Sequence, residues 1–277
     1  MVRDFGISQF TTTPWSFERD LVEYPRAGAA VIEVCEFKLN RADYVPQLAA
    51  VAAAGLRISS VQTTIHAVYP DSLAPSPLAP VDRVRHIEAA MERIAPHVPA
   101  GTPFVVITGA APNGDCERVF ATMLEVLPQL ADHAAALGMR VAYEPLNPIL
   151  FHSDTALWGL DAALELIERV DHAQLGLCLD TWNVFQTPNL LETIARARGK
   201  IFVVQLSDWQ RPRSNADRRN IGAGIIPTAI IVSAIEATGY DGPYVLEIFS
   251  EESLPGSLWR GDIAANLQLN ARAFKNL

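Results

Sequence analysis

Cysteine and basic residues are both scarce in this sequence. Three cysteines occur in 277 residues, none of them in a Cys-x-x-Cys pair, which excludes a disulfide framework and a paired-cysteine metal or redox motif. This usage is typical of a reducing compartment. Lysine and arginine together number 22 against 31 aspartates and glutamates, for a formal net charge of −9. Because nucleic acids and anionic membrane surfaces require clustered basic residues, we expect neither as a partner and expect a small-molecule ligand.

Long hydrophobic segments are missing as well. No apolar run reaches the roughly 18 residues that a membrane-spanning helix needs, and the first residues, MVRDFGISQF, lack the charged-then-apolar layout of a signal peptide. The segment GISQFTTTPW, after the first apolar run, contains no glycine-rich nucleotide-binding turn, which disfavours an open doubly wound sheet. We therefore expect a soluble, cytoplasmic protein.

The sequence does contain a repeating pattern of short apolar runs and helical stretches. Each run is rich in Val, Ile and Leu and is followed by loop residues and then by a stretch with helical periodicity, such as CERVFATMLEVLPQLADHAAALG. Eight such runs in a chain of this length predict a single (β/α)8 TIM barrel domain over residues 1–277. An open doubly wound sheet is the alternative. The runs lie at residues 4–10, 31–37, 57–64, 104–110, 140–146, 175–180, 201–208 and 244–250.

Polar residues end the last four runs in succession, where a barrel enzyme places its catalytic groups. Any one of them could cap a loop or pair with an arginine, but three carboxylates buried together would be costly without a cation. No lysine or arginine at the matching strand ends offers a counter-charge, so the pattern favours a divalent metal. Because side chains alternate along a strand, each polar residue shares a face with a small or apolar one. The polar residues are Glu144, Asp180, Gln205 and Glu247, and the residues two positions earlier are Ala142, Cys178, Val203 and Val245.

Four segments in this half of the chain carry a resemblance to a known family. VAYEPLNP, GLCLDTWN, VVQLSD and GYDGPYVLEIFS, in this order, resemble signatures of the xylose-isomerase-like TIM barrel superfamily of sugar isomerases and epimerases. Its relatives include inosose isomerases and dehydratases, ketose 3-epimerases, 3-dehydroshikimate dehydratase and endonuclease IV. The resemblance implies that Glu144, Asp180, Gln205 and Glu247 ligate one divalent metal ion. It also implies that Glu144 and Glu247 are the catalytic acid/base pair.

Two positions depart from the family pattern. Gln205 stands where the third ligand is commonly His, although some dehydratases of the family also have Gln there. Three carboxylates and an amide oxygen favour Mn²⁺ or Mg²⁺ over Zn²⁺, whose usual ligands include His or Cys. Asn183 stands three residues after Asp180, where the family often has His. Asparagine can hydrogen-bond a substrate hydroxyl but cannot transfer a proton near neutral pH.

Three residues are candidates for binding the substrate: His66, Asn183 and Arg219. His66 follows the third run, where an ordinary loop histidine is an equally good interpretation. Arg219 resembles an arginine that contacts substrate in the family, and Arg218 explains the sequence equally well. Glu33, on the second run, is expected to pair structurally within the barrel rather than to contact ligand.

The leading functional hypothesis is a divalent-metal-dependent isomerase or epimerase of a small sugar, ketose or polyol-derived hydroxy-carbonyl compound. It would act by proton abstraction next to a metal-bound carbonyl, through an enediolate intermediate. The alternative is a metal-dependent dehydratase of a cyclic polyol or a 3-dehydroshikimate-like acid. Endonuclease-like cleavage of a phosphodiester is the third hypothesis. A binding protein built on a catalytically inactive barrel is the non-enzyme alternative. A homo-oligomer is compatible with the sequence.

Overall fold

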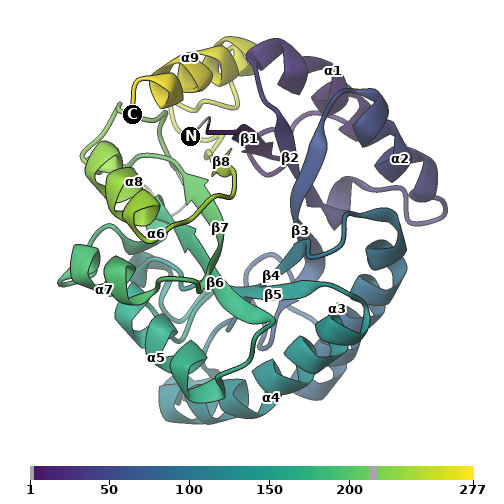
Figure 1. Cartoon of the computed structure of the whole chain (residues 1–277), viewed down its shortest axis with the longest axis vertical. Coiled ribbons are helices and arrows are strands. Elements are labelled where there is room, and N and C mark those ends of the chain that lie inside the picture. The colour runs from purple at the N-terminus through teal and green to yellow at the C-terminus, as the bar shows by residue number, and fades with distance from the viewer. Residues whose placement is uncertain (1–2, 212–216) are drawn as a thin grey trace.

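The computed structural model describes residues 3–211 and 217–277 of the chain. Eight parallel strands follow one another in chain order around a closed barrel, and β1 (Phe5–Ser8) hydrogen-bonds to β8 (Tyr244–Leu246) to close it. Figure 1 shows the ring of helices outside the strands. The predicted (β/α)8 barrel is confirmed. An open doubly wound sheet would leave its two edge strands unpaired, whereas here β1 and β8 pair with each other, so that alternative is excluded.

All eight predicted strands form, with differences at their C-terminal ends. The eighth run was expected to extend to residue 250, but its strand ends at Leu246 because the next residues enter the loops over the barrel. The third strand instead continues to Ala67, through a shift in register after Gln62. The remaining strands are β2 (Val31–Cys35), β3 (Arg57–Ala67), β4 (Pro103–Ile107), β5 (Arg140–Tyr143), β6 (Leu175–Asp180) and β7 (Ile201–Leu206).

Some of the helices begin at side-chain caps. The side chains of Ser16, Asp115 and Asp262 each accept a hydrogen bond from a backbone N–H in the first turn of the helix that follows. None of the described helices has the length and apolar character that spanning a bilayer requires. The helices are α1 (Phe17–Ala27), α2 (Val45–Ala53), α3 (Pro80–Ile94), α4 (Cys116–Ala136), α5 (Leu160–Val170), α6 (Thr181–Val184), α7 (Leu190–Arg196), α8 (Thr228–Ala237) and α9 (Ile263–Lys275), with short 3-10 helices at Glu36–Lys38, Ala95–His97, Pro112–Gly114 and Pro148–Leu150.

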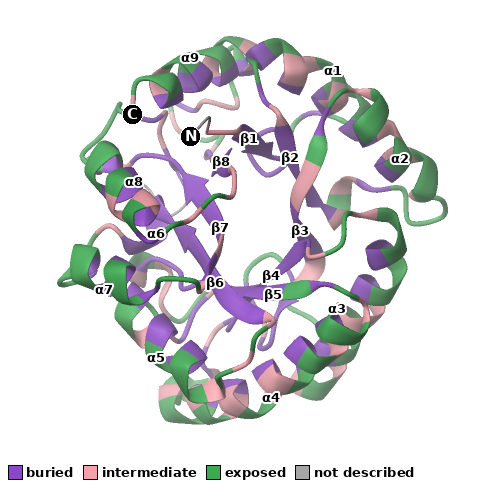
Figure 2. Ribbon diagram, viewed as in Figure 1, coloured by how far each residue is buried: buried purple, intermediate pink, exposed green. Residues whose placement is uncertain are grey.

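Two hydrophobic layers hold the barrel together. The larger lies between the strands and the surrounding helices, and Figure 2 shows the buried strands inside helices whose outer faces are exposed. The smaller, inside the barrel, is formed by Val105, Ala142, Cys178 and Val203. Ala142, Cys178 and Val203 were predicted to share a face with Glu144, Asp180 and Gln205. The barrel interior is therefore apolar in one layer and polar in the next layer toward the C-terminal ends of the strands.

Candidate active site

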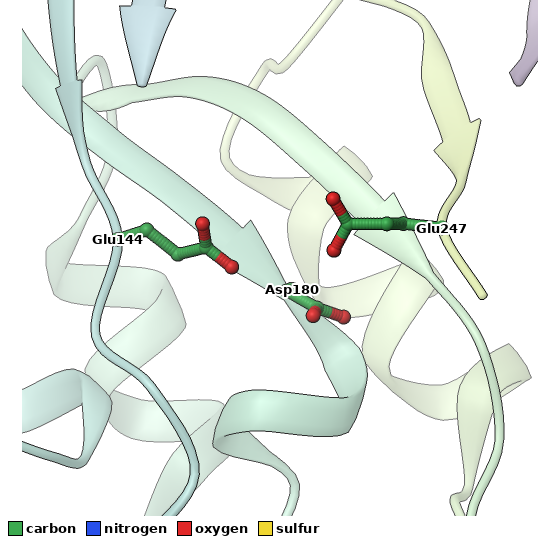
Figure 3. A group of neighbouring side chains, drawn as sticks. All are labelled: Glu144, Asp180 and Glu247. Atoms are coloured by element: carbon green, nitrogen blue, oxygen red, sulfur yellow. The ribbon is translucent and has the colours of Figure 1, made fainter. Parts of the chain in front are cut away.

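Three buried carboxylates, here called the acidic cluster, meet at the C-terminal end of the barrel. Glu144 directly follows β5, Asp180 is the last residue of β6, and Glu247 directly follows β8. One oxygen from each lies within 4.8 Å of the others, and Figure 3 shows the side chains pointing toward one another. Backbone hydrogen bonds fix two of them, because the N–H of Glu144 donates to Val106 O (2.9 Å) and that of Glu247 to Leu206 O (3.1 Å).

Asn183 holds two members of the cluster in place. Its Nδ2 donates to Glu144 Oε1 (2.7 Å) and to Asp180 Oδ2 (2.9 Å), while its Oδ1 accepts from the backbone N–H of Asn147 (2.9 Å). Asp180 is further fixed as the N-cap of α6, where its Oδ1 accepts from the N–H of Trp182 (3.0 Å). The structure thus places Asn183 against the carboxylates, and its role in binding substrate stays a prediction.

Arg218 is the cation of the site. Its Nη1 lies 2.7 Å from Asp180 Oδ2 and 2.8 Å from Glu247 Oε2, and its guanidinium lies between the rings of Trp182 and Phe249 at 4.8 and 4.9 Å. The expectation that no basic residue supplies a counter-charge is therefore wrong. It considered strand ends only, whereas Arg218 reaches the cluster from the long loop after β7.

Gln205 lies beside the cluster with its amide nitrogen turned toward two carboxylates. Its Nε2 donates to Glu247 Oε1 (3.1 Å) and to both oxygens of Glu33 (3.0 and 3.2 Å), and its Oε1 accepts from Cys178 Sγ (3.2 Å). The structural pairing expected for Glu33 is thus present. Ligation of a metal by the amide oxygen of Gln205 stays a prediction.

If all three were ionised, the carboxylates of the cluster would carry more negative charge than Arg218 neutralises. Burial raises the pKa of Glu144 well above its ordinary value, and the neighbouring Glu247 and Asp180 raise it further. Burial also raises the pKa of Glu247, to about 8, although Arg218 opposes this change. The pKa of Asp180 is raised by burial too, again against the effect of Arg218. All three shifts show that the site disfavours three anions with a single guanidinium.

A divalent cation fits this donor set. The cluster offers oxygen ligands from three buried side chains that converge on one point, and carboxylate oxygens are preferred by hard cations such as Mg²⁺ and Mn²⁺. Two positive charges there would offset the repulsion that raises the pKa values of Glu144 and Glu247. The acidic cluster could therefore hold a metal ion.

A pocket opens above the cluster. It has a volume of about 130 Å³, and Glu144, Glu247 and Arg218 line it. Much of the remaining wall is apolar and includes Phe10, Ile107, Leu146, Trp182 and Phe249.

The other two predicted substrate-binding residues differ in position. His66 lines the pocket, where its Nδ1 lies 3.0 Å from Thr63 O and burial lowers its pKa, which favours the neutral ring. Arg219 is not among the described lining residues, and its Nη1 donates to Gly256 O (2.6 Å). The structure brings His66 and Arg218 to the pocket. A contact of Arg219 with substrate stays a prediction.

Sequence reasoning missed Gln62 and Asn147. Gln62 lines the pocket and donates to Glu247 Oε1 (2.8 Å), and Asn147 orients Asn183 through its backbone N–H. Gln62 had a usable signal, since it follows Ser60 by two residues on a strand and so marks a polar inner face. Asn147 lies in a loop, where alternation gives no such signal.

Comparison with curated proteins finds three kinds of enzyme. The chain is 30% identical to 3-dehydroshikimate dehydratase of Pseudomonas aeruginosa over 178 residues, 60% of this chain and 26% of that protein. It is 25% identical to inosose isomerase of Bacillus subtilis over 141 residues, 49% of each. It is 26% identical to ketose 3-epimerase of Arthrobacter globiformis over 152 residues, 52% of this chain and 49% of that protein. The chain thus spans about a quarter to a half of the length of these relatives.

Solved structures share the whole fold. A protein of Sinorhizobium meliloti superposes with a TM-score of 0.85 at 22% identity, over 100% of this chain and 98% of that one. The IolI protein, solved with a zinc atom bound, superposes with a TM-score of 0.76 at 17% identity, over 99% and 97% of the two chains. The profile of the xylose isomerase-like TIM barrel family matches residues 23–273. The closed barrel and this match over most of the chain show that the protein belongs to the xylose isomerase-like TIM barrel family.

Proposed function

We propose that this protein is a divalent-metal-dependent isomerase or epimerase of a small sugar, ketose or polyol-derived hydroxy-carbonyl compound. The observation that carries the proposal is the convergence of Glu144, Asp180 and Glu247 at a pocket over the C-terminal end of the barrel. The similarity to an inosose isomerase and a ketose 3-epimerase supports it.

Glu144, Asp180 and Glu247 would hold the ion. The amide oxygen of Gln205 is the fourth ligand that the sequence predicts, and ligation by it would require the amide to turn away from Cys178 and Glu247. A divalent cation held by these residues would supply Lewis-acid polarisation of a substrate carbonyl, which would acidify the adjacent C–H bond. Because all four proposed ligand atoms are oxygens, we propose Mn²⁺ or Mg²⁺. Because the IolI structure contains zinc, Zn²⁺ is the ion against which Mn²⁺ and Mg²⁺ should be tested.

Glu144 and Glu247 are the proposed proton-transfer pair. They extend from the non-adjacent strands β5 and β8 and point toward each other, so a substrate between them would meet a carboxylate on two sides. One carboxylate takes the proton of the C–H next to the carbonyl, and a proton returns to the same carbon from the other side in an epimerisation. In an isomerisation the proton returns to the neighbouring carbon while a hydroxyl proton moves to the former carbonyl oxygen. Both reactions are redox-neutral.

The charges of the pocket favour an uncharged substrate. Arg218 is the one arginine or lysine among the described lining residues, and two carboxylates already pair with it. Asp154 adds an acidic side chain to the wall, whereas Asp71 there is paired with the buried Arg83 (3.1 Å). A hydroxylated neutral molecule could hydrogen-bond to these groups, whereas an acid would have to share Arg218 with Asp180 and Glu247.

A metal-dependent dehydratase of a cyclic polyol or a 3-dehydroshikimate-like acid is the second candidate. The similarity to the Pseudomonas aeruginosa dehydratase, at 30% identity, favours it. Abstraction of the same proton would serve this reaction, with the hydroxyl of the next carbon leaving as water.

Hydrogen exchange with solvent D₂O tests the proposal whatever the final product is. Protein loaded with Mn²⁺, Mg²⁺ or Zn²⁺ would be incubated with neutral ketoses, inososes and 3-dehydroshikimate, and deuterium uptake followed by NMR. We expect metal-dependent uptake next to the carbonyl of a neutral compound, faster with Mn²⁺ or Mg²⁺ than with Zn²⁺. Uptake confined to an acid that also loses water would favour the dehydratase. Metal binding without exchange on any compound would favour a binding protein.

A further inference from the structure

Glu33 is a fully buried carboxylate behind the acidic cluster. It lies on β2, does not belong to the described pocket lining, and is 0% exposed. It accepts hydrogen bonds from Ser60 Oγ at Oε2 (2.7 Å), from Gln62 Nε2 at Oε1 (2.9 Å) and from Gln205 Nε2 at both oxygens (3.0 and 3.2 Å). Glu33 is thus separated from the pocket by two glutamine amides.

Both amides connect Glu33 to the same oxygen of Glu247. The Nε2 of Gln62 lies 2.9 Å from Glu33 Oε1 and 2.8 Å from Glu247 Oε1. The Nε2 of Gln205 lies 3.0 Å from Glu33 Oε1 and 3.1 Å from Glu247 Oε1. An amide nitrogen has two hydrogens, so each glutamine can give one to each carboxylate. Either amide, if reversed, would set its carbonyl oxygen against two carboxylates.

This arrangement makes the two oxygens of Glu247 unequal. Oε1 accepts from Gln62 and Gln205, which engages both of its lone pairs. Oε2 accepts from Arg218 Nη1 (2.8 Å) and keeps a lone pair for another partner. We infer that Glu33 is a positioning residue that, through Gln62 and Gln205, fixes Glu247 so that Oε2 is the oxygen presented to a metal ion or to a substrate proton.

The inference rests on the proposed metal site formed by the three carboxylates, with Gln205 anchoring Glu247 instead of ligating the ion. It gives Glu33 a role as a hydrogen-bond acceptor rather than as a charge. Two substitutions separate these roles. Glu33→Leu removes the acceptor at similar size, so both amides lose their anchor. Glu33→Gln can keep a carbonyl oxygen at the Oε1 position, where both amides bind, while its new NH₂ faces the Ser60 hydroxyl, which can accept a hydrogen bond.

Metal affinity measured by competition with a chromophoric chelator is a readout independent of activity. Groups that orient metal ligands typically contribute about 10- to 100-fold in affinity. We therefore expect Glu33→Leu to bind Mn²⁺ about 10- to 100-fold more weakly than the wild type, and Glu33→Gln to bind it nearly as tightly. With a substrate found by D₂O exchange, Glu33→Leu at saturating metal should lower kcat and leave KM nearly unchanged.

Asp20→Asn is the matched control, because Asp20 is also a fully buried carboxylate bound by a glutamine amide, away from the pocket lining. It should leave metal affinity unchanged. Wild-type affinity in folded Glu33→Leu, or equal weakening in Glu33→Leu and Asp20→Asn, would overturn the inference. Loss of affinity in Glu33→Gln would also overturn it, since charge would then be what matters.

If Glu33→Leu does not fold, Gln62→Leu replaces it. This variant removes one of the two bridging amides and leaves Glu33 in place, so it should weaken Mn²⁺ binding in the same direction. Unchanged affinity there would overturn the inference. A wild-type protein that binds no metal would instead overturn the proposed function, and the inference with it.

Discussion

Two buried polar groups of this barrel differ in how they balance charge. The Asp20 network, near the N-terminal part of the chain, consists of Gln9, Thr12, Asp20, Tyr24 and Lys38. Its carboxylate accepts from Gln9 Nε2 (2.8 Å), Thr12 Oγ1 (2.7 Å) and Lys38 Nζ (2.7 Å). Lys38 also donates to the backbone and hydroxyl oxygens of Thr12 (2.7 and 3.1 Å). One anion and one cation thus satisfy each other.

The acidic cluster has three carboxylates, which among the described residues meet one guanidinium, that of Arg218. Two of the carboxylates, Glu144 and Glu247, line a pocket. A balanced, enclosed network stabilises the fold, whereas an unbalanced one at a pocket leaves capacity for a ligand of positive charge. The comparison therefore separates polar residues that serve the fold from those that serve the function. Substitutions in the Asp20 network should therefore change stability, whereas substitutions in the acidic cluster should change metal binding and catalysis.

The largest effect should come from neutralising the proposed acid/base pair. At saturating metal, Glu144→Gln and Glu247→Gln should each lower kcat by about 10² to 10⁴, the usual contribution of one general acid or base. Steady-state kinetics on a substrate found by D₂O exchange would measure this loss. Asp20→Asn, on the other side of the comparison, should keep kcat. Near wild-type exchange in metal-saturated Glu247→Gln together with its loss in a His66→Gln variant would identify His66 as the base.

Lys38→Met should break the balanced network. Removing one partner of a buried ion pair typically costs about 3–5 kcal/mol of unfolding free energy, and urea denaturation would measure it. Burial raises the pKa of Asp20 to about 6 even though Lys38 lowers it. The folded state therefore binds this proton more tightly than the unfolded chain, and stability is lost as the pH rises through about 6. Without Lys38 the loss should be larger at pH 8 than at pH 5.

The double variant Asp20→Asn/Lys38→Met is the control for this result. It removes both charges, so it should be more stable at pH 8 than Lys38→Met alone. If Lys38→Met lost the same unfolding free energy at pH 5 and at pH 8, the packing of the lysine stem rather than its charge would account for the effect.

Arg218→Met removes the guanidinium that pairs with Asp180 and Glu247 in the acidic cluster. Without metal, the uncompensated carboxylates should lower the melting temperature. Added Mn²⁺ should then raise it by more than in the wild type, because the ion supplies charge that the variant lacks. Differential scanning fluorimetry with and without Mn²⁺ would measure both changes. An equal rise in the two proteins would show that Arg218 and the metal act independently.

Asn183→Ala should have the smallest effect of the four. It removes the donor shared by Glu144 and Asp180 and leaves all three carboxylates in place. We expect about 10-fold weaker Mn²⁺ binding, at the low end of the range for groups that orient ligands. Chelator competition would measure it. A raised KM with unchanged metal affinity would instead support the contact with substrate that the sequence suggested.

The sequence predicted the barrel well because strand and helix periodicities are local. All eight apolar runs became strands, and the alternation that put Ala142 and Cys178 on one face with the polar residues was correct. It also placed Glu144, Asp180 and Glu247 at strand ends that a closed barrel must bring together. These outcomes follow from the two-residue alternation of side chains along a strand and from the closure of eight parallel strands into a barrel.

The loops were not predictable in the same way. Arg218 and Arg219 are neighbours in sequence, but only Arg218 reaches the carboxylates, because the path of the loop after β7 decides which side chain faces inward. The orientation of the Gln205 amide depends on Glu33, which lies 172 residues earlier in the chain. Such contacts depend on tertiary structure rather than on any local pattern.

The metal content of four proteins tests the central claim most directly. Wild type, Glu144→Gln, Asp180→Asn and Asp20→Asn would be equilibrated with Mn²⁺, desalted and measured by elemental analysis, with circular dichroism to confirm folding. We expect one ion per chain in the wild type and in Asp20→Asn, and loss of the ion in folded Glu144→Gln and Asp180→Asn. Wild-type occupancy in both cluster variants would contradict it.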